Sequence, residues 1–147
     1  MHKNILLLHV LAATIWAGGH LVLALTVLPR VLRERSPAEL LRFEGGYEKI
    51  GMPALLIQVA SGLWLAYALV PDVRAWFVAD DPFARLILLK LSLLATTLLL
   101  AADARLRIIP RLSPETLPAL ARRIVLVTFI SVLFVATGVA FRTGSLL

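Results

Sequence analysis

Four long apolar runs, separated by short polar stretches, organise the chain. They are Ile5–Leu28, Met52–Val70, Leu86–Ala102 and Ile124–Phe141. Each run is close to the length of about 20 residues that a helix needs to cross the hydrocarbon core of a bilayer. We therefore expect an all-α integral membrane protein, a four-transmembrane-helix bundle in which residues 1–147 form a single membrane domain. The expected spans are residues 5–28, 52–70, 84–103 and 122–142, each placed approximately.

The polar stretches carry signals for the ends of helices. Ser36–Pro37 followed by Glu39 has the pattern of a helix start, with a serine cap and a proline at the first helical position. We expect a short amphipathic helix there, lying on the membrane surface and ending at Gly45–Gly46. Met52–Pro53 is predicted to open the second span, and Asp81–Pro82 to cap the third.

Composition and charge fit a membrane protein. The chain is 60% hydrophobic with a mean hydropathy of +0.90, which is too apolar for a small soluble domain. Its net charge of +6 does not indicate a nucleic-acid partner, because the basic residues gather near the ends of the spans.

These basic residues also predict the orientation in the bilayer. The first connection carries Arg30, Arg33, Arg35, Arg42 and Lys49, and the third carries Arg105, Arg107, Arg111, Arg122 and Arg123. The opposite side carries Lys3, Arg74, Arg85 and Arg142. Because loops rich in Lys and Arg stay in the cytoplasm, we expect a multi-pass protein of a bacterial inner membrane with both termini in the periplasm.

The two halves of the chain repeat a set of short motifs in the same order. The matched pairs are Leu7–His9 with Leu88–Lys90, Leu28–Arg30 with Ile109–Arg111, Ser36–Pro37 with Ser113–Pro114, and Ser61–Gly62 with Thr137–Gly138. We expect two tandem helical hairpins, residues 1–72 and 82–147, related by an axis along the membrane normal. This repeat makes His9 and Lys90 equivalent, at one depth and on opposite sides of the bundle axis.

His9 and Lys90 are the leading candidates for a metal or cofactor site. Polar side chains at membrane depth are costly and mark candidate functional sites. Neutral imidazole is a common ligand of haem iron and other metals, and an amine that has lost its proton in a low-dielectric site can also bind a metal. The alternatives are a structural hydrogen bond for His9 and, for Lys90, a side chain that reaches back to the interface.

His20 and Trp16 lie on the same helical stripe as His9 and are further cofactor-binding candidates. Eleven residues of helix separate the two histidines by about 16 Å, so both cannot hold one haem. His20 is expected to bind a second cofactor, to relay protons, or to form a structural bond with Thr97, Gln58 or Ser61.

The residue types available as metal ligands bear on the choice between haem and copper. The chain has no cysteine, two methionines and three histidines, whereas soft copper sites favour Cys, Met and His. Four-helix bundles often hold cofactors between facing helices. The residues alone therefore favour a b-type haem between His9 and Lys90 over copper, and a structural subunit with no cofactor is the third alternative.

Several stretches resemble the copper-resistance D (CopD) family. They are LHVLAATIWAGG in the first span, RLILLKLSLLATTLLLAADARLRIIPRL in the third, and ATG in the last. The resemblance implies a four-helix unit linked by name to copper uptake or tolerance, often with a periplasmic copper-binding partner.

A more distant resemblance is to HemJ-type protoporphyrinogen oxidases. It rests on His9, on Leu28–Arg30 and on Lys90. That family is understood to bind b-type haem through its histidine and lysine. The leading hypothesis is thus a membrane-embedded haem b protein for electron transfer or redox chemistry, a haem-dependent oxidoreductase if it is an enzyme. Its partners would be the lipid bilayer, an electron donor or quinone, and a second copy in a homodimer. The alternatives are copper transport or tolerance without haem and a HemJ-like oxidase.

Overall fold

The computed structural model describes residues 2–78 and 80–143, and these are helical apart from short connections. The elements are α1 (His2–Val22), η1 (Leu23–Val27), α2 (Leu28–Glu34), α3 (Pro37–Leu69), α4 (Ala75–Val78), α5 (Pro82–Asp103), η2 (Ala104–Ile108), η3 (Ile109–Arg111) and α6 (Leu117–Thr143). Within this part of the chain, four rods are long and apolar enough to cross a membrane: His2–Glu34, Pro37–Leu69, Pro82–Arg111 and Leu117–Thr143. The predicted fold class, an all-α membrane bundle of four spans, is confirmed.

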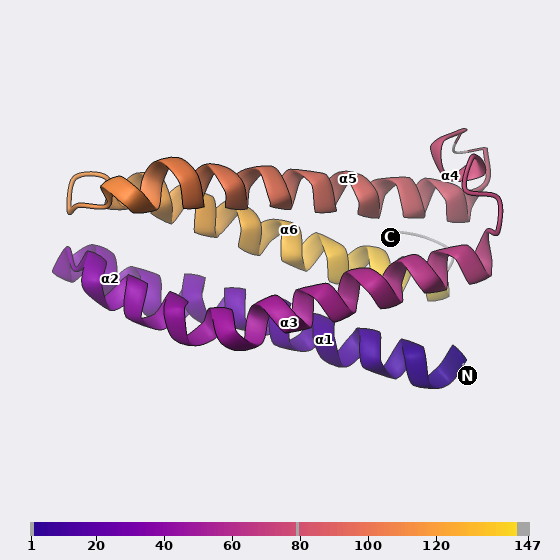
Figure 1. Cartoon of the computed structure of the whole chain (residues 1–147), viewed down its shortest axis with the longest axis horizontal. Helices are drawn as coiled ribbons and strands as arrows, with labels where there is room; N and C mark the ends of the chain where they lie inside the picture. Colours follow the sequence, from indigo (N-terminus) through magenta and orange to yellow (C-terminus); the bar gives the residue numbers. More distant parts are fainter. Residues whose placement is uncertain (1, 79, 144–147) are drawn as a thin grey trace.

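The four rods run side by side and alternate in direction (Figure 1). The N-terminus, the end of α6 and the connection between α3 and α5 lie at one end, which we call the terminal end. The turn before α3 and the turn between η3 and α6 lie at the other, which we call the loop end. The chain thus forms two consecutive helical hairpins.

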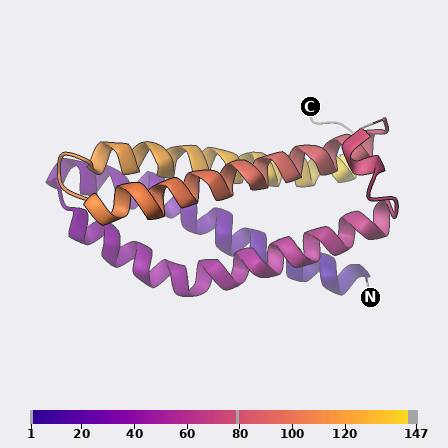
Figure 2. The ribbon, with the colours of Figure 1, turned by 45° about the horizontal axis from the view of Figure 1, so that its top comes forward.

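The two hairpins meet through α1 and α6. α1 packs against both α3 and α6, and α5 packs against α6, whereas α3 and α5 scarcely touch. Figure 2 shows α5 lying along α6, with α3 crossing α1 in the other hairpin. The result is an open arrangement in which one long side, between α3 and α5, is not closed by helix packing.

The best-packed part of the interior lies toward the loop end. Its buried side chains come from the first, second and fourth rods: Leu23, Val27, Val31, Leu40, Leu117 and Leu120. Elsewhere large apolar side chains face outward, among them Leu25 and Leu99, which are 73% and 72% exposed. Such outward faces suit a lipid environment, because lipid tails solvate them.

Two π-helical turns interrupt the first and third rods. In η1 the Leu28 N–H donates to the Leu23 carbonyl, and in η2 the Ile109 N–H donates to the Ala104 carbonyl. A proline follows each turn, and its ring clashes with the carbonyl four residues earlier in a regular helix. The wider π turn accommodates this clash without breaking the rod.

The predicted surface helix ending at Gly45–Gly46 is wrong. α3 runs without interruption from Pro37 to Leu69, so this pair and Met52–Pro53 lie inside one helix. The predicted caps are confirmed: the Glu39 N–H donates to Ser36 Oγ at 3.4 Å, and the Phe83 N–H donates to an Asp81 carboxylate oxygen at 2.8 Å. A mid-helix glycine costs only about 1 kcal/mol, which packing against α1 offsets.

Candidate metal site

His9 is held by a chain of hydrogen bonds to α3. Its Nδ1 lies 2.9 Å from Ser61 Oγ, and the Ser61 hydroxyl donates to the Ile57 carbonyl at 2.6 Å. The hydroxyl has a single hydrogen, which it uses in the bond to that carbonyl. The contact with His9 is therefore a hydrogen bond from the His9 Nδ1–H to Ser61 Oγ. The neutral ring then carries its lone pair on Nε2, the form in which imidazole binds metals.

A glycine makes room for this ring. A Cβ built on Gly62 would lie 3.0 Å from His9 Cε1, so α3 approaches the imidazole closely at that residue. Beside it, Gln58 Oε1 is buried without a hydrogen-bond donor among the described residues. Since an unpaired buried oxygen is costly, this atom marks polar surface next to His9 that a bound ligand would satisfy.

Lys90 points into the second hairpin. Its Nζ lies 5.4 Å from the centroid of the Phe141 ring and 3.6 Å from the position of a Cβ on Gly138. The ammonium is near enough to His9 for its charge to act on the ring, and in the described part of the chain it has no acidic partner. The two predicted residues are thus within electrostatic range of each other, and no hydrogen bond joins them among the described residues. Their equal depth stays a prediction.

His20 is held in the same way as His9, by a different partner. Its Nδ1 lies 2.9 Å from the Trp16 carbonyl, which accepts, so the ring nitrogen must donate. Nε2 again keeps the lone pair and has no donor among residues 2–78 and 80–143. The predicted bonds to Thr97, Gln58 or Ser61 are not formed, because the i−4 carbonyl on α1 is closer to the ring.

Trp16 and Tyr47 enclose His20. The Trp16 ring is buried, with its centroid 4.7 Å from that of His20, and the Tyr47 ring meets His20 edge to face at 5.6 Å. The Tyr47 hydroxyl donates to the Trp16 carbonyl at 2.8 Å, so one carbonyl anchors both side chains.

Tyr47 is the residue of the site that sequence reasoning missed. It is wedged between two glycines: a Cβ on Gly51 would lie 2.8 Å from Tyr47 Cζ, and a Cβ on Gly19 would overlap its ring. The available signal was the presence of small residues on both helices, which permits close packing of the backbones.

Each of the two histidines can supply one nitrogen ligand to a metal ion, and the two nitrogens lie at different depths. Within the described residues, no group of three His, Asp or Glu side chains is placed to hold a metal ion. His9 and His20 each offer one imidazole nitrogen, and about 16 Å of helix separates them.

Comparison with known proteins gives one result. A family model described as copper resistance protein D matches residues 41–142, which include α5, nearly all of α6 and most of α3. The match begins after α1, so His9 and His20 lie outside it. No curated protein and no solved structure matches the chain.

Proposed function

The chain belongs to the copper resistance protein D family, and from that premise we propose that it handles copper within the membrane, as a transport or tolerance protein. His9 and His20 are its copper ligands. The loop end faces the cytoplasm of a bacterial inner membrane and both termini face the periplasm, where a copper-binding protein exchanges the ion. Lys90 modulates the ligand strength of His9 through its charge, or binds the ion directly.

One observation supports this assignment most strongly. Both histidines inside the first span donate Nδ1–H to a fixed acceptor and leave Nε2 without a partner among the described residues. In metal-binding histidines, a hydrogen bond from the ring nitrogen that does not bind the metal fixes the tautomer and the orientation of the ring. With no cysteine in the chain, imidazole is the chief copper ligand available within the spans.

We favour copper over haem b as the species that this protein binds. The family description names copper, and neither the structure nor the comparisons support haem or a relationship to HemJ-type oxidases. The His9–Lys90 pair expected to clasp a haem has no supporting contact beyond proximity.

The experiment is a copper-tolerance assay in a bacterial host that lacks its own copper-tolerance membrane proteins. Cells carrying the wild type, His9→Ala or Leu8→Ala are grown over a range of copper concentrations, and their copper content is measured. Leu8 is the matched control, because it neighbours His9 but is 48% exposed on the outer face.

We expect the wild type and Leu8→Ala to change both the tolerated copper concentration and the cell copper content by at least about twofold relative to empty vector. His9→Ala should behave like empty vector at equal membrane abundance. A wild type indistinguishable from empty vector would overturn the proposed function.

A further inference from the structure

A groove lies between α2 and α6 near the loop end. It has a volume of about 490 Å³ and is lined by apolar side chains of both helices, with Arg122 as its one polar residue. Leu28 and Ala121 are buried and lie at its floor, whereas the exposed side chains of Leu32 and Val125 lie at its sides. The groove is therefore an apolar surface with a single guanidinium in its lining.

Both helices place this groove at the boundary of the predicted spans. Leu28 is the last residue of the first apolar run, and Arg122 is the first residue of the predicted span 122–142. Two rods that run in opposite directions thus give the same depth. Leu126 lies inside the span and Pro118 lies outside it. One part of the groove is therefore at the level of lipid chains and the other at the level of lipid headgroups.

The protein does not neutralise the charge of Arg122. The next residue, Arg123, donates from Nε to an Asp103 carboxylate oxygen at 2.7 Å, so it faces the end of α5. In the described part of the chain, the ion pairs leave Arg122 without a carboxylate partner. A guanidinium stays charged, and its planar set of N–H donors matches a phosphate group. Its surroundings therefore favour an anion as the partner of Arg122.

The net charge of the loop end acts in the same direction. Residues 30–49 and 103–123, which connect the spans at this end, contain ten Lys and Arg and six Asp and Glu, a net charge of +4. Most of this excess belongs to residues 103–123, the segment that contains Arg122. Basic pockets between transmembrane helices bind the headgroups of anionic lipids. The groove combines such a charge with a surface for a hydrocarbon chain.

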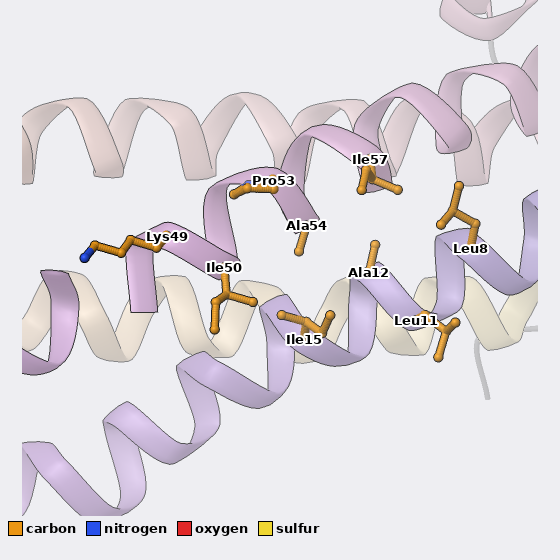
Figure 3. A pocket seen from close by; sticks show the side chains of 9 residues that line it. All are labelled: Leu8, Leu11, Ala12, Ile15, Lys49, Ile50, Pro53, Ala54 and Ile57. Atoms are coloured by element: carbon orange, nitrogen blue, oxygen red, sulfur yellow. The ribbon is translucent and has the colours of Figure 1, made fainter. Parts of the chain in front are cut away.

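A second groove, between α1 and α3, lacks this combination. It has a volume of about 310 Å³. Figure 3 shows apolar side chains such as Leu11, Ile15 and Ala54 gathered between the two helices, whereas the Lys49 ammonium is directed away from them, toward the loop end. The interior of this groove can accept a hydrocarbon chain, but it does not distinguish one headgroup from another.

We propose that the groove between α2 and α6 binds a phospholipid whose headgroup carries a net negative charge. An acyl chain lies against Leu28, Ala121 and Leu126, and the headgroup phosphate binds Arg122. The lipid neutralises the guanidinium and covers the contact of α2 with α6, where the two hairpins meet at the loop end. This binding does not depend on the proposed copper function.

Native mass spectrometry of the detergent-purified protein tests this site. The protein is titrated with phosphatidylglycerol and, separately, with phosphatidylcholine of the same chains, and the Kd of the first bound lipid is measured. Arg122→Ala is compared with Arg42→Ala, which removes an equal charge. Arg42 is exposed on α3 toward the loop end and lines neither groove. Detergent solution offers both ends of the bundle to lipid, so the result does not depend on the orientation in the membrane.

We expect the wild type and Arg42→Ala to bind phosphatidylglycerol at least about fivefold more tightly than phosphatidylcholine. In Arg122→Ala the two affinities should agree within about twofold, because phosphatidylglycerol binds more weakly. Arg122→Gln should lose the preference in the same way, which keeps the test valid if the alanine variant folds poorly.

Three outcomes would overturn the proposal. A wild type that binds both lipids equally would show that no anionic headgroup is selected. An Arg122→Ala variant that keeps the full preference would remove Arg122 from the site. Equal losses in Arg122→Ala and Arg42→Ala would mean that the lipid responds to the net charge of the loop end and does not bind in the groove.

Discussion

At the scale of single residues, the hydroxyl of Ser61 determines which nitrogen of His9 is available to a metal. Its O–H donates a hydrogen bond to the Ile57 carbonyl, and its oxygen accepts a hydrogen bond from the His9 Nδ1–H. The histidine could be found from the sequence, because a polar side chain inside an apolar run stands out. The tautomer could not, because it depends on a serine 52 residues away on another helix.

Replacing that serine tests its role. In Ser61→Ala the ring loses its acceptor and turns more freely, so the copper(I) affinity of the purified protein should fall by about tenfold, the lower end of the effect of removing such partners. Ser92→Ala is the matched control, because Ser92 is exposed on α5 and, among the described residues, its hydroxyl bonds only to the Leu88 carbonyl of its own helix. Equal affinities of the two variants, measured by competition with a chromophoric chelator, would show that Ser61 does not position the ligand.

Lys90 shows the limit of prediction at this scale. The motif repeat predicted that it lies at the depth of His9, and its charge acts on the His9 ring in the structure. Its ammonium nevertheless lies over the Phe141 ring, a contact that sequence spacing gave no means of foreseeing. Its role as a metal ligand stays a prediction.

At the scale of elements, the contact between α1 and α3 depends on Gly19 and Gly51, which leave space for the Tyr47 ring. The four spans could be predicted from hydropathy, and the serine and aspartate caps from local chemistry. The extent of α3 could not, because Gly45–Gly46 and the neighbouring charges have the composition of a helix end. Packing against α1 and the anchored Tyr47 ring keep the helix continuous.

A pair of adjacent glycines provides the test of this contact. Gly19→Ala drives a methyl group into the Tyr47 ring and should destabilise the protein by about 1–3 kcal/mol, the usual cost of overpacking. Gly18→Ala should be neutral or slightly stabilising, because a Cβ there meets nothing within 4 Å. Thermal unfolding in detergent measures both.

The double variant Gly19→Ala/Tyr47→Ala separates the clash from a general effect of alanine. Gly19→Ala should lower the thermal stability less in a Tyr47→Ala background than in the wild type, because the ring that the methyl group meets is gone. Equal thermal stability of Gly18→Ala and Gly19→Ala would mean that α1 and α3 do not meet as closely as described.

The π-helical turns also belong to this scale. They occupy Leu23–Val27 and Ala104–Ile108, each just before the proline of a repeated motif. The offset between them equals that between His9 and Lys90. The tandem repeat stays a prediction.

At the scale of the whole molecule, the bundle is two hairpins joined along α1 and α6 and open between α3 and α5. Hydropathy predicted the number of spans and hence that the termini share one end. The openness could not be predicted, because hydropathy does not determine which helices pack against one another. Which end faces the cytoplasm stays a prediction from the basic residues.

The central claim is that imidazoles within the first span bind copper. Its most direct measurement is a copper(I) competition titration of the purified wild type and of His9→Ala/His20→Ala, with absorption spectra and iron content recorded on the same samples. The account predicts a wild type without haem bands, whose copper(I) affinity falls at least about tenfold in the double variant. Equal copper(I) affinities, or a haem spectrum that disappears in the double variant, would contradict it.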